Sequence, residues 1–205
     1  MKKTVICDIS MKENIDKVLY TSDDRSLPVS DRKVSYPITA FLEKTMKKED
    51  DLNVILLVKQ DKFGNYKKNM EIFKEELDTV NNDIGASIEY DVINTAFDET
   101  KAVHEQLMGQ IVERIPDNEH VLVDITYGPK DLPIVIFAAL SFAEKHLGCT
   151  IDNIIYGKAN FENGRAVDTK ICDMVPLYYL QSLSNTIHSS VPGKAREALR
   201  SLLSM

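Results

Sequence analysis

The chain has few cysteines and no recognisable cluster of metal-binding side chains. Its 205 residues include three cysteines, at long spacings and without a CxxC pair. The four histidines are scattered and form neither an HExxH motif nor a paired Cys/His pattern. This composition is typical of a reduced, intracellular protein and disfavours a zinc site. We expect neither metal nor cofactor, and a chain of this length can bury a core without disulfides.

Long apolar runs and an excess of positive charge are also lacking. The longest apolar run, residues 132–142, is interrupted by Pro133 and is shorter than the roughly 18 residues of a membrane span. The apolar run after Lys2 and Lys3 ends at Asp8, so no signal peptide is visible. Lys and Arg number 25 against 32 Asp and Glu, a net charge of −7. We therefore expect a cytoplasmic protein that neither spans a membrane nor binds duplex nucleic acid, although a small anionic ligand is compatible with this charge.

The chain does contain short apolar segments that alternate with amphipathic ones. Segments with the pattern of strands lie at 4–8, 53–59, 87–93, 120–125 and 153–157. Segments with helical spacing of apolar residues lie at 37–46, 66–80, 99–115 and 132–147, and again from Leu177 onward. This alternation predicts a single α/β domain, residues 1–205, of Rossmann-like type, with a mainly parallel sheet and helices on both faces.

Other segments are predicted to be less regular. Residues 10–33 are polar and predict a loop, with a small hairpin around Val18–Tyr20. Residues 158–166 are polar, with a turn signal at Asn163 and Gly164, and are followed by a hairpin arm at 167–172. Asp98 can cap the helix that begins at Glu99. Pro192 and Gly193 break the C-terminal helical segment, which ends in an amphipathic stretch from Lys194 to Met205.

Polar or glycine residues follow three of the predicted strands. These strand ends are Asp8-Ile9-Ser10, Asp124 to Lys130, and Tyr156-Gly157-Lys158. If the three strands are parallel neighbours, their ends converge on one rim of the sheet, where open α/β sheets bind ligands. The sequence thus places a candidate site at this rim.

The middle strand end, Asp124-Ile125-Thr126-Tyr127-Gly128-Pro129-Lys130, has the chemistry of a phosphate site. Gly128 lets a backbone approach a ligand closely, Lys130 offers a point charge, and the start of the next helix favours an anion. Neither GxGxxG nor GxxxxGK(S/T) is present, so dinucleotide-binding and P-loop hypotheses lack their usual support. A plain strand-to-helix turn with a surface lysine is the alternative. Asp124 can orient this loop by accepting backbone N–H groups, which is structural support and not acid–base catalysis.

Several segments resemble CARF domains, the CRISPR-associated Rossmann fold. Asp124 to Pro133 resembles the family's D-(I/L)-T-(H/F/Y)-G-x-(K/R)-x-(L/M)-P core. Asn153 to Gly157 is similar to its last core strand, and Met174 to Leu177 is similar to the D-x-T-P-L stretch that follows. Asn69 to Leu77 resembles a segment of one CARF branch. The resemblance covers essentially the whole chain in the right order, but the first loop lacks the glycine often found there.

The resemblance implies a homodimeric sensor of cyclic tetra- or hexa-adenylate, the messengers of type III CRISPR antiviral defence. The ligand would lie across the two-fold axis, and binding would be transmitted to an attached effector. No effector is recognisable, so we expect a stand-alone sensor or one whose effector was removed after about Met205. The residues that this resemblance and their position imply as ligand-binding are Asp8, Ile9, Ser10, Met11, Asn69, Thr126, Tyr127, Gly128, Pro129, Lys130, Tyr156, Gly157 and Lys158.

Two alternatives stay open. The first alternative is an enzyme, a ring nuclease that cleaves the messenger slowly and without metal, with the ribose 2′-OH as nucleophile. Ser10, Thr126 and Lys130 would then stabilise developing charge. No histidine is expected near either loop as a general base, which disfavours fast cleavage. The other alternative is an α/β protein that binds a different nucleotide. Tyr127 is a candidate stacking face for a base, or else a half-buried rim residue.

Overall fold

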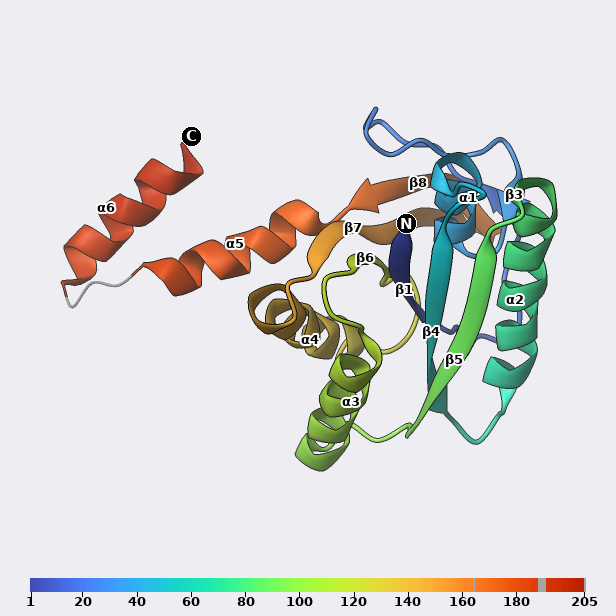
Figure 1. The fold of residues 1–205 in the computed structure, drawn as a ribbon, viewed down its shortest axis with the longest axis horizontal. Helices are drawn as coiled ribbons and strands as arrows, with labels where there is room; N and C mark the ends of the chain where they lie inside the picture. Colours follow the sequence, from blue (N-terminus) through green and yellow to red (C-terminus); the bar gives the residue numbers. More distant parts are fainter. Residues whose placement is uncertain (164, 188–190, 205) are drawn as a thin grey trace.

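A mostly parallel sheet forms the centre of the structure (Figure 1). The computed structural model describes residues 1–163, 165–187 and 191–204. Within these residues six strands form the sheet, in the order β5-β4-β1-β6-β7-β8, and β8 alone is antiparallel to its neighbour. The strands are β1 (Lys2–Asp8), β4 (Asp51–Gln60), β5 (Ser87–Ala96), β6 (His120–Asp124), β7 (Thr150–Glu162) and β8 (Arg165–Asp173). The predicted Rossmann-like α/β architecture is confirmed.

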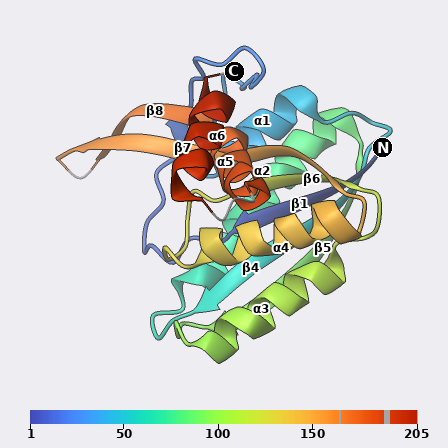
Figure 2. The ribbon, with the colours of Figure 1, turned by 90° about the vertical axis from the view of Figure 1, so that its left-hand side faces the viewer.

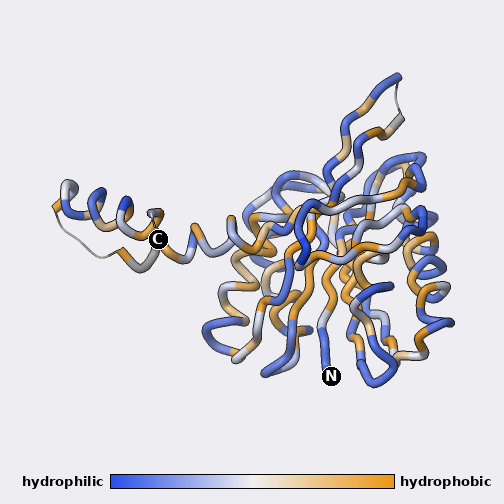
Figure 3. The backbone as a smooth tube through the Cα atoms, turned by 90° about the horizontal axis from the view of Figure 1, so that it is seen from above, coloured by the Kyte–Doolittle hydropathy of each residue, from blue (hydrophilic) through white to orange (hydrophobic). Residues whose placement is uncertain are grey.

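Helices cover both faces of this sheet. The helices are α1 (Pro37–Thr45), α2 (Asn65–Ile84), α3 (Lys101–Arg114), α4 (Leu132–His146), α5 (Val175–Thr186) and α6 (Pro192–Leu203). Successive strand residues point to opposite faces, so a strand covered on both sides is apolar throughout. Val5 of β1 packs in the core beneath α1 and α2 with Phe73, whereas its neighbour Ile6 packs beneath α3 and α4 with Ile111 and Ile136. Figure 3 shows the hydrophobic strands running through the body between hydrophilic loops.

Two predicted boundaries are wrong. The helix after Asp98 begins at Lys101, with Thr100 at its N-cap, so Asp98 lies outside the helix and does not cap it. The segment 158–162, expected to be an irregular polar stretch, belongs to β7. It pairs with β8 through partners such as Phe161 and Ala166, and this backbone ladder stabilises a strand whose side chains are largely polar.

The other segments match their predictions more closely. The 10–33 segment is mostly loop, and its small hairpin consists of β2 (Val18–Leu19) paired with β3 (Lys33–Val34). The hairpin arm expected at 167–172 is β8. The strand expected at the sheet edge is β5. Gly164 of the predicted turn, His188 and Met205 lie outside the described residues.

The C-terminal helices leave the body of the domain. Figure 1 shows α5 running away from the sheet and α6 lying beyond it, and in Figure 2, seen from that side, both helices lie in front of the sheet. α5 is anchored near its start, where Tyr178 is buried against Phe137 and donates a hydrogen bond of 2.8 Å to Glu144 Oε2. In the described residues of α6 no side chain is buried. A 12-residue amphipathic helix without a buried face gains little stability of its own.

Candidate functional site

The three predicted strand ends meet at one rim of the sheet. β1, β6 and β7 are adjacent and parallel, with Cys7 opposite Asp124 and Asp124 opposite Ile155. The Gly157 N–H donates a hydrogen bond of 2.8 Å to Thr126 Oγ1, which ties the end of β7 to the loop after β6. The predicted convergence is therefore confirmed, whereas the ligand expected there stays a prediction.

The loop after β1 is held from below by Asn69. Its amide Nδ2 donates to the carbonyl oxygens of Ser10 and Lys12, at 2.7 and 2.8 Å. Asn69 is fully buried on α2, and Ser10 is 1% exposed. Asn69 was expected as a ligand-binding residue. In this structure its side chain instead fixes the backbone from which Met11 and Lys12 extend.

The loop after β6 is organised by Asp124, as the sequence indicated. Asp124 Oδ1 accepts the Thr126 N–H at 2.8 Å, and Oδ2 accepts the Ile38 N–H at 3.2 Å. Burial raises the pKa of Asp124 to about 6, although the hydrogen bonds from Thr126 and Ile38 act in the opposite direction. Asp124 is thus a structural carboxylate that shapes the loop from beneath.

Tyr127 is held with its ring at the rim. Its hydroxyl donates to the Ser35 carbonyl at 2.7 Å, and its ring meets the ring of Tyr36 edge to face at 5.2 Å. Burial raises the pKa of the Tyr127 phenol far above its ordinary value, so the phenol stays neutral. Tyr127 is therefore a half-buried rim residue with the Lys12 ammonium 5.9 Å from its ring centroid, and stacking of a base on this ring stays a prediction.

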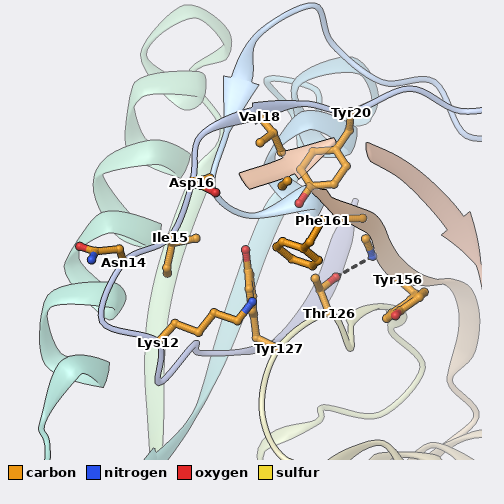
Figure 4. Close-up of a pocket in the computed structure, with 13 residues that line it drawn as sticks. Lys12, Asn14, Ile15, Asp16, Val18, Tyr20, Thr126, Tyr127, Tyr156 and Phe161 are labelled. Carbon is orange, nitrogen blue, oxygen red and sulfur yellow. Dashed lines mark hydrogen bonds between the residues drawn. The ribbon is translucent and has the colours of Figure 1, made fainter. Parts of the chain in front are cut away.

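The rim contains an open cavity of about 300 Å³ between the two loops and the β7–β8 hairpin (Figure 4). An adjoining hollow of about 330 Å³ runs along the first loop past Gly128. Lys12, Thr126 and Tyr127 line both, so the two hollows form one continuous surface. Both lie beyond the carboxyl ends of the strands, where α/β sheets place their ligands.

The structure distributes the predicted residues unevenly around this surface. Those that line it are Ser10, Met11, Thr126, Tyr127, Gly128, Tyr156 and Gly157. Asp8 and Ile9 are buried. Pro129, exposed Lys130 and exposed Lys158 are absent from the described lining of both hollows, and Lys158 faces another groove with Thr21.

The sequence did not indicate several residues that line the cavity. They include Lys12, Asp16, Tyr20 and Phe161. Lys12 directly follows the predicted first loop and was within reach of a sequence argument. Phe161 was not, because it reaches the cavity only through the antiparallel extension of β7 against β8.

A buried carboxyl lies beneath the second loop. Gly128 has φ +85°, and a methyl group added there would lie 3.5 Å from Asp8 Oδ2. Within the described residues neither carboxylate oxygen of Asp8 has a hydrogen-bond partner. Burial, followed by the charges of Asp124 and Asp131, raises the pKa of Asp8 well above its usual range, against the lowering influence of Lys59. Asp8 is therefore suited to a structural position rather than to contact with an anionic ligand.

One histidine lies closer to the second loop than the sequence suggested. His104 Nε2 is 3.0 Å from Asp131 Oδ2, and Asp131 also pairs with buried Lys59 at 3.3 Å. Packing of α3 against α4 brings His104 beside Asp131, the residue after the second loop, but no histidine is among the described residues that line either hollow. This cluster borders an apolar groove with Met108 and Ile134 instead of the cavity.

The described residues show neither a group of side chains that could hold a metal ion nor a helix that could span a membrane. Within residues 1–163, 165–187 and 191–204, no three His, Cys, Asp or Glu side chains are placed to hold a metal ion. None of the described helices is long and apolar enough to cross a membrane. No protein-family model matches the chain, and no curated protein has a significantly similar sequence.

Proposed function

We propose that the chain is a sensor domain that acts as a homodimer and binds a cyclic oligoadenylate, the function implied by its resemblance to CARF domains. The observation that carries the proposal is the composition of the rim cavity. It combines an ammonium group at Lys12 with the aromatic rings of Tyr127 and Phe161, next to the exposed backbone of Gly128. Aromatic faces stack on unpaired bases, and ammonium groups bind phosphate.

The size of the cavity supports a ligand shared between two copies. About 300 Å³ is at the small end of the range for ligand sites. It suits part of a cyclic oligonucleotide better than the whole ring. A ring with two-fold symmetry would engage two such cavities related by a molecular two-fold axis.

Apolar side chains next to the second loop offer a surface for pairing. The inner face of α4 belongs to the core, with residues such as Ile136 and Leu140 fully buried. Its outer face carries Ile134 and Phe142, which are 73% and 39% exposed and lie eight residues apart, on one side of the helix. Burial of such side chains between two copies would favour association.

The chain connectivity supports transmission toward the C-terminus. The cavity is bordered by the β7–β8 hairpin, through Phe161 and Ala166, and β8 leads directly into α5. A ligand that moves the hairpin therefore acts on the strand from which α5 begins. An effector attached after α6 would receive this displacement.

The test is calorimetric titration of the full chain with cyclic tetra-adenylate and with cyclic hexa-adenylate, and linear tetra-adenylate serves as the control. We expect one ring to bind with a stoichiometry of one ring per two chains, and the linear form to bind more weakly. The recovered ligand is then separated by chromatography. Intact ligand indicates a sensor without nuclease activity, and linear product indicates a ring nuclease. Binding of neither ring overturns the proposal.

A further inference from the structure

Lys12 stands out among the residues of the rim because of what its ammonium contacts. In the described part of the chain it lies 5.2 Å from the centroid of the Phe161 ring and 5.9 Å from that of Tyr127. Lys12 and Phe161 are exposed, and a cation over an aromatic ring at an exposed site is only weakly bound. The ammonium therefore rests on two rings that do not hold it tightly.

The backbone of Lys12, in contrast, is fixed. Its N–H donates to Ser10 Oγ at 3.2 Å, and its carbonyl accepts from Asn69 Nδ2 at 2.8 Å. Tyr127 is equally fixed through Ser35 and Tyr36. A side chain that swings from a fixed backbone beside a fixed ring can exchange one partner for another without loss of loop structure.

The charge balance of the cavity gives this lysine a specific task. Lys12 is the one basic residue in the described lining of either hollow, and Asp16 is the one acidic residue there. An anion that enters meets the repulsion of Asp16, with Lys12 as the compensating charge. Lys130, the lysine singled out by the sequence, lies outside this described lining.

We propose that Lys12, rather than Lys130, is the phosphate-binding cation of the site. Its contacts with the two aromatic rings are replaced by contacts with a nucleotide. Its ammonium leaves Phe161 and Tyr127 and pairs with a phosphate, and the ring faces that it uncovers stack on a base. The ligand class is a nucleotide, which carries an anionic phosphate and an aromatic base together. This inference rests on the proposed function for the identity of the full ligand, but the lysine exchange applies to a single nucleotide as well.

The first test compares Lys12→Met with Lys130→Met, which removes the same charge from the same rim. Binding of cyclic tetra-adenylate, cyclic hexa-adenylate and adenosine 5′-monophosphate is measured over a range of salt concentrations. We expect Lys12→Met to weaken binding about tenfold or more and to reduce the salt slope by about 0.7, as loss of one phosphate contact requires. Lys12→Arg should retain most of the affinity, and Asp16→Asn should increase it. Equal effects of Lys12→Met and Lys130→Met, or an unchanged salt slope, would overturn the proposal.

The second test observes the exchange itself by proton NMR. Ring currents of Phe161 and Tyr127 should shift the Lys12 side-chain methylene signals upfield, and Phe161→Leu should reduce that shift. Saturation with adenosine 5′-monophosphate should return these signals toward their ordinary position, whereas adenosine should do so less because it lacks phosphate. Signals that stay shifted in the bound protein contradict the exchange.

These measurements separate failure of the inference from failure of the proposed function. If a cyclic oligoadenylate binds with an affinity that does not depend on Lys12, the sensor proposal stands and the proposed role of Lys12 is wrong. Binding of the mononucleotide through Lys12, with no binding of either ring, keeps the lysine site and removes the cyclic ligand. If none of the three nucleotides binds, both the proposed function and the proposed role of Lys12 are overturned.

Discussion

Substitution of Gly128 by alanine tests the arrangement of the second loop. Gly128 has φ +85°, a conformation that residues with a side chain adopt at a cost of roughly 1–2 kcal/mol. The added methyl group would also lie 2.6 Å from Leu132 Cδ1, at the start of α4. Leu132 is 1% exposed and has little room to move. The strained backbone and the close contact with Leu132 should therefore both destabilise the Gly128→Ala variant.

The magnitude follows from comparison with Gly64, which provides a matched control. Gly64 has φ +72°, but a methyl group added there meets nothing within 4 Å. Gly64→Ala should cost about 1 kcal/mol, because reduced entropy of the unfolded chain offsets part of the backbone strain. Gly128→Ala adds overpacking against a buried side chain, which typically costs about 1–3 kcal/mol, so we expect a total of about 3 kcal/mol.

Urea unfolding followed by circular dichroism measures both variants under the same conditions. The difference in free energy of unfolding between Gly128→Ala and Gly64→Ala isolates the contact with Leu132. A Gly128→Ala variant as stable as Gly64→Ala would refute the close packing of the loop against α4. We also expect Gly128→Ala to weaken ligand binding, because the loop must shift away from its native path.

Three further predictions concern the surroundings of the site. Burial raises the pKa of Asp124 to about 6 and also raises that of Asp8, so the folded state binds these protons more tightly than the unfolded state. The free energy of unfolding should therefore fall as pH rises from about 4 through 6, and Asp8→Asn should reduce this fall in urea titrations. An unchanged pH profile in Asp8→Asn would contradict this prediction. Asn69→Ala removes two hydrogen bonds donated by a buried amide and should cost about 2 kcal/mol, with faster amide exchange in the first loop. Unchanged exchange would show that the loop does not depend on this amide. Deletion of 191–205 should shift the calorimetric thermal midpoint by less than about 2 °C, because no described residue of α6 is buried. A large drop in the midpoint would show that this helix packs against the domain.

The sequence was sufficient to predict the architecture because buried parallel strands and amphipathic helices have distinct patterns. β4 contains the continuous apolar run Val54–Val58 and β1 the shorter run Val5–Cys7, and Phe73 and Leu77 repeat at helical spacing on α2. The rim could be predicted for the same reason, because parallel neighbours bring their carboxyl ends together. Asp124 was correctly expected to accept backbone N–H groups of the second loop.

The content of the cavity was harder to predict because it depends on contacts far apart in the chain. Phe161 reaches the rim through pairing of β7 with β8, which the polar sequence of 158–162 conceals. Asn69 has a polar side chain on a helix, yet it is fully buried because two loop carbonyls accept its N–H groups. His104 approaches residue 131 only through helix packing. None of these positions has a local sequence pattern.

The most direct test of the proposed site is photocrosslinking of the full chain with an azido-adenine derivative of the cyclic oligoadenylate that binds, followed by identification of the labelled peptides. Excess unlabelled ring should suppress the specific label. We expect label in the peptides that contain Lys12, Tyr127 and Phe161, which come from three separate parts of the sequence and meet in one cavity. Suppressible label confined to other peptides, such as those of Met108 and Ile134 in the groove between α3 and α4, would contradict it.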